Sequence, residues 1–162
     1  MGLNLATYTS VHVAFSLVGI ASGLVVLLGL LAGKRLNTST AVFLVTTVAT
    51  SVTGYGFPFD HLLPSHIVGA ISLAALALAI YARYSRHLAG PWRATYVVGA
   101  VVALYLNVFE LVVQSFMKEP ALNDLAPTQS EPPFAVAQLA VLVLFIVLGT
   151  LAVRRSRTIS TT

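Results

Sequence analysis

The distribution of charge along the chain constrains its fold more than any other feature. Eight of the nine cationic side chains occur in three short clusters that separate long apolar runs. These clusters are Lys34 with Arg35; Arg83, Arg86 and Arg93; and Arg154, Arg155 and Arg157. The other two gaps carry Asp60, Glu119, Asp124 and Glu131, with Lys118 as the one basic exception. This alternation is the positive-inside pattern of a protein that crosses a membrane several times.

The composition supports a membrane protein. The chain has 162 residues, of which 57% are hydrophobic and 9% are charged, whereas a soluble domain carries about 25% charged residues. The basic residues lie at the ends of apolar runs and not in one stripe, so nucleic acid is excluded as a partner. We expect anionic lipid headgroups as partners instead. Cysteine is absent, which excludes disulfides and thiolate metal sites.

Five apolar segments are predicted to cross the membrane, since a span needs about 20 apolar residues. They cover approximately residues 8–33, 39–56, 65–84, 92–117 and 133–153. The links between them are short, so neighbours in sequence are expected to be antiparallel neighbours in space. We therefore predict an all-α integral membrane protein, a single domain over residues 1–162, built as an antiparallel bundle of five transmembrane helices.

The charges also predict the orientation: the N-terminus lies outside and the C-terminus in the cytoplasm. The first run has no preceding Lys or Arg and ends at Gly33-Lys34-Arg35, so we expect a retained helix and not a cleaved signal peptide.

The second segment is the weakest candidate for a membrane span, because it is short and rich in threonine. Its hydroxyls can bond back to their own helix, and they indicate a face turned towards protein.

Polar residues within the spans are the candidate functional residues. His66, Glu110 and Gln138 lie 16 or 17 residues from the nearest basic cluster, which places them roughly 25 Å above the inner boundary. His12 is 22 residues before Lys34, about 7 Å higher. Gln114 has a similar height to His12.

Asn107, Glu110 and Gln114 share one helical face at spacing i, i+3, i+7. With His12, His66 and Gln138 they predict a polar layer that opens towards the outer side. An ionisable group in a span is costly unless it is paired or neutralised, so Glu110 is the strongest functional candidate. Helix packing by hydrogen bonds explains the same residues without any ligand.

Three functions are compatible with this layer. The first is a non-enzymatic protein that binds a hydrophobic or amphipathic ligand, or that acts as an accessory subunit of a larger membrane complex or homo-oligomer. The second is a b-type cytochrome with His12 and His66 as haem ligands, although their height difference of about 7 Å opposes it. The third is a small proton-coupled transporter centred on Glu110. No metal-ligand spacing, hydrolytic triad or phosphate loop is present.

Three stretches carry a resemblance to a known group. They are Thr53-Gly54-Tyr55-Gly56-Phe57-Pro58-Phe59; Ala82-Arg83-Tyr84 followed by Leu88-Ala89-Gly90-Pro91-Trp92-Arg93; and Ala126-Pro127-Thr128-Gln129-Ser130-Glu131-Pro132-Pro133-Phe134. Over residues 40–155 the chain resembles a group of small bacterial inner-membrane proteins without an assigned activity. The resemblance implies a bacterial cytoplasmic membrane and no functional residue.

Overall fold

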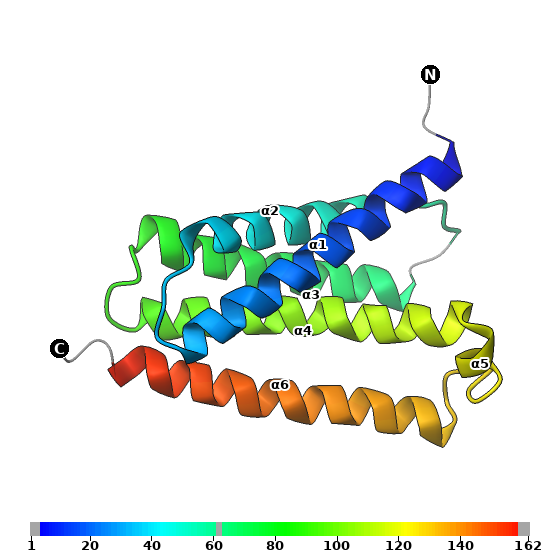
Figure 1. Cartoon of the computed structure of the whole chain (residues 1–162). Helices are drawn as coiled ribbons and strands as arrows, with labels where there is room; N and C mark the ends of the chain where they lie inside the picture. Colours follow the sequence, from blue (N-terminus) through cyan, green and yellow to red (C-terminus); the bar gives the residue numbers. More distant parts are fainter. Residues whose placement is uncertain (1–3, 61–62, 159–162) are drawn as a thin grey trace.

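The computed structural model describes residues 4–60 and 63–158, and within these ranges every regular element is helical. Five helices run along the length of the molecule (Figure 1). They are α1 (Leu5–Leu31), α2 (Asn37–Gly54), α3 (Pro64–Ile80), α4 (Trp92–Lys118) and α6 (Pro132–Thr158). A short α5 (Pro120–Asn123) follows α4, and a π-helical segment, η1 (Tyr81–Ser85), continues α3.

Local sequence explains where α1 begins and ends. The Asn4 side chain accepts a hydrogen bond from the backbone N–H of Thr7 at 2.8 Å, so the helix starts three residues before the predicted span. Gly33 has a φ of 71°, in the left-handed region that a glycine adopts without a steric penalty, and it ends the helix. The sequence therefore predicted this helix but not its first turn, because a polar cap carries no apolar signal.

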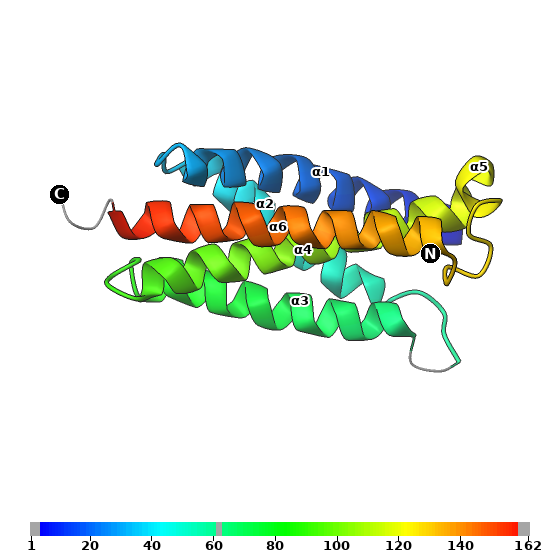
Figure 2. The same ribbon diagram turned by 90° about the horizontal axis from the view of Figure 1, so that it is seen from below.

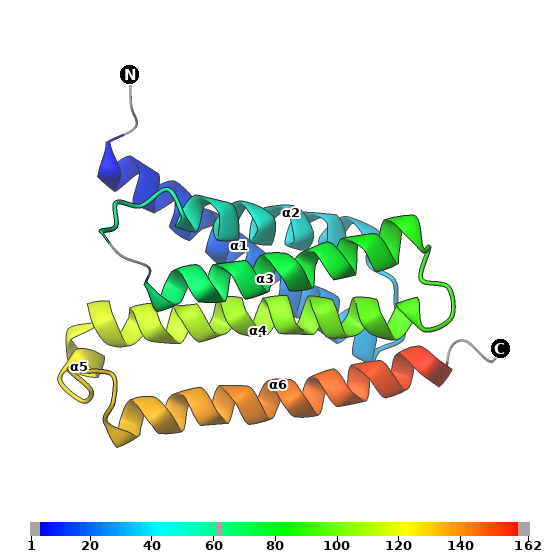
Figure 3. The same ribbon diagram turned by 180° about the vertical axis from the view of Figure 1, so that it is seen from behind.

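The five long helices form an antiparallel bundle whose two ends differ in charge. The N-terminus lies at one end and the C-terminus at the other (Figures 1 and 3). The three basic clusters all belong to the C-terminal end, which we call the basic end. The opposite end, called the acidic end, holds Asp60, α5 and residues 119–131. Helix α6 packs on α4 and α1, and Figure 2 shows it between the α1 and α3 sides of the bundle.

Aromatic and aliphatic side chains fill the centre of the bundle, and hydroxyls line one side of it. Phe43, Leu76, Tyr96, Val97 and Leu104 are among the fully buried residues. Helix α2 buries a polar face made of Thr40, Thr47, Thr50 and Ser51, while it exposes Val42, Val45 and Val52. The predicted inward orientation of the hydroxyl face of this segment is confirmed.

Four helices are long and apolar enough to cross a membrane: α1, α3 with η1, α4 and α6. Helix α2 has 18 residues and is rich in threonine, so it is not among them. It nevertheless packs against α1 as part of the bundle (Figure 1). The prediction of a helical bundle compatible with several membrane crossings is confirmed, and a fifth crossing by α2 stays a prediction.

The link between α4 and α6 is ordered by a small hydrogen-bond network that the sequence did not predict. Both the backbone N–H and the hydroxyl of Thr128 donate to Glu131 Oε1, at 3.2 and 2.8 Å. The Ser130 N–H donates to Glu131 Oε2 at 3.1 Å. Desolvation alone would raise the pKa of the Glu131 carboxyl, but these hydrogen bonds to the charged form outweigh it and lower the pKa.

Close backbone contact between α3 and α4 gives a test of the packing. A Cβ at Gly99 would lie 2.7 Å from the carbonyl oxygen of Ala75 and 3.3 Å from the Ala79 nitrogen. These are backbone atoms that cannot move independently, so Gly99→Ala should reduce the free energy of unfolding by roughly 1–3 kcal/mol. Titration with a denaturing detergent in mixed micelles measures this quantity.

Gly54→Ala is the matched control. Its nearest neighbour would be His12 Cε1 at 3.8 Å, and alanine is the better helix former by up to about 1 kcal/mol. Equal destabilisation of the two variants would contradict the described contact between α3 and α4.

Candidate functional site

A cavity of about 730 Å³ opens at the acidic end of the bundle. Helix α1, the end of α2, the link from α2 to α3, the first turn of α3, the second half of α4 and α5 enclose it. Its polar lining includes Thr9, His12, Ser16, Ser65, His66, Glu110, Gln114, Ser115, Lys118 and Glu119. Its apolar lining includes Val13, Leu17, Phe57, Pro58, Phe59, Leu63, Leu111 and Leu122. The volume falls within the range of roughly 300–1,000 Å³ that is usual for small-molecule sites.

Four of the six candidate residues line this cavity: His12, His66, Glu110 and Gln114. They come from three helices, so the tertiary structure joins groups that extend from position 12 to position 114 of the sequence. Gln114 Nε2 donates to Glu110 Oε1 at 2.9 Å. Glu110 Oε1 is thereby bonded to a residue one turn later in the same helix. Glu110 Oε2 makes no hydrogen bond with the described residues and is available to a ligand.

His12 is oriented by a chain of hydrogen bonds to α2. The Thr53 hydroxyl donates to the Ala49 carbonyl at 2.7 Å and lies 2.8 Å from His12 Nδ1. Because the hydroxyl has a single hydrogen, which the Ala49 carbonyl can accept, we assign the neutral tautomer in which Nδ1 donates to the hydroxyl and Nε2 keeps its lone pair. The ring also packs edge-on against Phe57, with centroids 5.1 Å apart. Glu110 and Lys118 are the charged groups that act on His12 electrostatically.

His66 has a local structural role that accounts for its position. Its Nδ1 accepts the backbone N–H of Leu63 at 3.0 Å, as the third residue of a capping box does at the start of a helix. The ring lies 4.3 Å from the Phe59 ring and 5.4 Å from the Tyr55 ring, centroid to centroid. Tyr55 also donates its hydroxyl to the His66 carbonyl at 2.6 Å. His66 therefore fixes the first turn of α3 and one wall of the cavity.

Asn107 and Gln138 do not line the cavity. Asn107 is buried below it, with Nδ2 3.5 Å from the hydroxyl of Thr47. Gln138 donates through Nε2 to the Phe109 carbonyl at 3.2 Å and so ties α6 to α4. Its Oε1 is buried and has no hydrogen-bond partner among the described residues. Both residues act in packing between helices, because their helix faces are turned towards neighbouring helices.

The sequence did not identify the aromatic wall of the cavity. Phe57, Pro58 and Phe59 belong to the short link after the second predicted span, and the structure places them in the lining of the cavity. Tyr8 contributes by packing on Phe57, with centroids 5.0 Å apart, and by donating to the Thr53 carbonyl at 2.6 Å. The signal that could have found them is the concentration of aromatic rings between two prolines, next to a span that carries a histidine.

No family model matches the chain, and neither curated proteins nor solved structures match it significantly. The resemblance to small bacterial inner-membrane proteins therefore stays a prediction.

The hydrogen bonding of His66 does not fit the haem alternative. Axial ligation requires a lone pair on a ring nitrogen whose partner nitrogen carries a hydrogen. His66 Nδ1 accepts an N–H, so Nε2 of the neutral ring carries the hydrogen and has no lone pair for iron. His12 alone offers such a nitrogen. Two-histidine ligation would require the cap of α3 to break.

We therefore expect protein purified from haem-replete cells to show no Soret band of a low-spin, two-histidine haem. Absorption spectroscopy in mild detergent, with haem quantified by the pyridine haemochrome assay, measures this. A stoichiometric Soret band that disappears in both His12→Ala and His66→Ala would contradict the hydrogen-bonding assignment.

Proposed function

We propose that this protein is a multi-pass protein of the bacterial cytoplasmic membrane that binds an amphipathic small molecule in the acidic-end cavity. The observation that carries the proposal is the cavity of about 730 Å³, with His12 and the Glu110–Gln114 pair on its walls. Its mixed lining is what a ligand with an apolar body and a polar head requires.

The polar groups define the ligand further. Glu110 Oε2 makes no hydrogen bond with the described residues, and His12 has a lone pair on Nε2 in the assigned tautomer, so both present hydrogen-bond acceptors. The charged residues of the lining are Glu110, Lys118 and Glu119, which sum to a net charge of −1. The ligand that matches carries a hydrogen-bond donor or a positive charge in its head, and its apolar part lies against Phe57 and Phe59. The charge of Glu110 then has a partner, which reduces its cost in a membrane.

The transporter centred on Glu110, the accessory subunit and the homo-oligomer remain predictions from the sequence. The cavity favours ligand binding over them because it supplies a large concave volume and hydrogen-bond acceptors at one place.

Filling the cavity should abolish ligand binding. Ser16→Leu adds an apolar side chain to the lining, and Glu110→Gln removes the charge while keeping the shape. We expect each variant to retain about a tenth or less of the co-purifying ligand, because the first removes volume and the second removes a charged hydrogen-bond partner. Mass spectrometry of organic extracts from gently purified protein measures the bound compound.

Ser22→Leu is the control, because Ser22 belongs to the same helix and does not line the cavity. An equal amount of the same compound in wild type and in both cavity variants would overturn the proposal, as would an extract that contains bulk lipid only.

The proposed orientation can be tested with introduced cysteines, because the natural chain has none. Ala121 in α5 and Ser85 at the end of η1 are both exposed and lie at opposite ends of the bundle. A membrane-impermeant maleimide should label Ala121→Cys in intact spheroplasts, and Ser85→Cys only after permeabilisation, because the basic end faces the cytoplasm. Labelling of both positions in intact spheroplasts would contradict a membrane crossing by α4, which alone separates them in the sequence.

A further inference from the structure

A second, smaller cavity lies at the basic end, far from the site just described. It has a volume of about 50 Å³ and is open to the surface. One water needs roughly 10–15 Å³ by the same kind of measure, so a small polyatomic group fits. The link after α1, the first turn of α2, η1, the start of α4 and the end of α6 all contribute to its lining.

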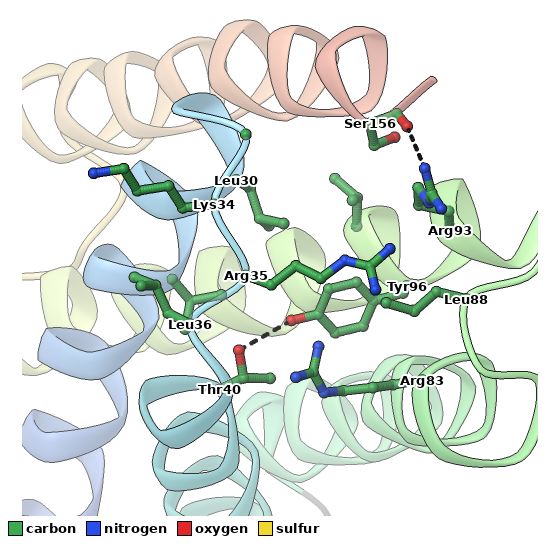
Figure 4. Close-up of a pocket in the computed structure, with 13 residues that line it drawn as sticks. Leu30, Lys34, Arg35, Leu36, Thr40, Arg83, Leu88, Arg93, Tyr96 and Ser156 are labelled. Atoms are coloured by element: carbon green, nitrogen blue, oxygen red, sulfur yellow. Dashed lines mark hydrogen bonds between the residues drawn. The ribbon is translucent and has the colours of Figure 1, made fainter. Parts of the chain in front are cut away.

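Four cationic side chains contribute to this cavity, whose lining is otherwise mostly apolar and includes no acidic residue. Lys34, Arg35, Arg83 and Arg93 all contribute. Figure 4 shows the guanidinium groups of Arg35 and Arg83 near the ring of Tyr96, and the Lys34 ammonium group extending away from them. The five acidic residues of the chain are Asp60, Glu110, Glu119, Asp124 and Glu131, none of which belongs to this end of the bundle. The positive charge of the cavity is therefore not neutralised by the described protein groups.

Arg93 is the residue that most clearly lacks a partner. Its Nε is buried and makes no hydrogen bond with the described residues. Its Nη1 makes only a long contact, 3.4 Å, with the Ser156 carbonyl (Figure 4). A buried guanidinium N–H without an acceptor is costly, and in native proteins such a group calls for an anion or water.

Arg83 is held in place before any ligand arrives. Its Nη2 donates to Asn37 Oδ1 at 2.6 Å, and its Cζ lies 5.4 Å from the centroid of the Tyr96 ring. The Tyr96 hydroxyl makes a long hydrogen bond, 3.4 Å, to Thr40 and also interacts with Arg83. A fixed guanidinium and a weakly engaged hydroxyl on adjacent walls are pre-organised donors.

The backbone around η1 is unusual in a way that shapes this cavity. The π-helical turn is closed by a bond from the Arg86 N–H to the Tyr81 carbonyl at 3.0 Å, and such turns are rare and frequent at functional sites. His87 and Leu88 follow with φ values of 49° and 57°, in the left-handed region that disfavours both side chains. Leu88 is 7% exposed and forms part of the cavity wall. The strained backbone segment therefore includes Leu88, which belongs to the same cavity lining as the arginines.

From this geometry we infer that the basic-end cavity binds a phosphate group. Guanidinium groups match the tetrahedral oxygens of phosphate with paired N–H donors, and several converging arginines favour an anion with more than one charged oxygen. The phosphate comes either from the headgroup of an anionic lipid in the cytoplasmic leaflet or from a soluble phosphate. The inference is independent of the proposed ligand at the acidic end, because the two cavities share no lining residue.

Binding to delipidated protein in a non-ionic detergent tests the inference. The probes are dioctanoyl phosphatidic acid, inorganic phosphate and, as a phosphate-free analogue, dioctanoylglycerol, with binding followed by native mass spectrometry and thermophoresis. We expect Arg83→Gln and Arg93→Gln each to weaken binding about tenfold or more, because each removes charge-assisted hydrogen bonds. Arg35→Gln, in the exposed link, should act in the same direction and does not depend on tolerance of a change in a helix.

Arg155→Gln is the matched control, since it removes the same charge at the same end outside the cavity. It should change affinity by less than about twofold, because an exposed charge is screened by salt. Binding of both phosphate probes identifies a soluble phosphate as sufficient, and binding of phosphatidic acid alone identifies a lipid headgroup; each supports the site. Equal weakening in Arg155→Gln, equal binding of dioctanoylglycerol, or no saturable binding of either phosphate probe would overturn it.

Discussion

The fold depends on one constraint: only 9% of the residues are charged and four helices are long and apolar enough to cross a membrane, a composition compatible with an apolar solvent. In such a solvent each backbone N–H and C=O must be satisfied inside its own segment, and helices achieve this. The hydroxyl groups of threonine and serine must likewise find hydrogen-bond partners within the protein. Thr46, Thr50 and Thr53 bond back to carbonyls one turn earlier, and the buried Ser51 and Ser72 bond to each other. Close packing then needs small residues, so Gly19 and Gly23 lie where α1 meets Thr47, Phe43 and Leu104.

The bundle separates two kinds of chemistry along its length. At the acidic end, the α2–α3 link and α4 create a large cavity with acceptors and aromatic rings, suited to an amphipathic molecule. At the basic end, arginines converge on a small cavity without a carboxylate. Charges that set orientation in a membrane protein need only be near the interface. Burial of Arg93 Nε goes beyond that need, and this is why the basic end is better described as an anion site than as a topological signal alone.

Features whose physical cause lies within one segment of the sequence could be predicted, and features that depend on contacts between segments could not. Apolar runs predicted the five long helices, strongly for the four that are long and apolar enough to cross a membrane and more weakly for the threonine-rich α2. The end of α6 at Thr158, the short α5 and the π-helical η1 were not predicted, because polar residues at the ends carry no apolar pattern. Counting residues from the basic clusters placed His12, Glu110 and Gln114 at neighbouring heights, and the structure joins them at one cavity. The same count could not reveal that His66 caps its own helix or that Gln138 bonds to the Phe109 carbonyl.

The sequence by itself determined that the chain is helical, that its helices alternate in direction, and which charges share an end. These properties follow from composition and from spacing along one dimension. Only the tertiary structure decided which helix faces meet. It made the Phe57–Phe59 link part of the wall of the acidic-end cavity, turned Asn107 towards Thr47, and brought Arg35, Arg83 and Arg93 into the lining of one cavity. The physical reason is that rotation of a helix about its axis depends on side-chain packing with its neighbours, which no single segment of this chain specifies.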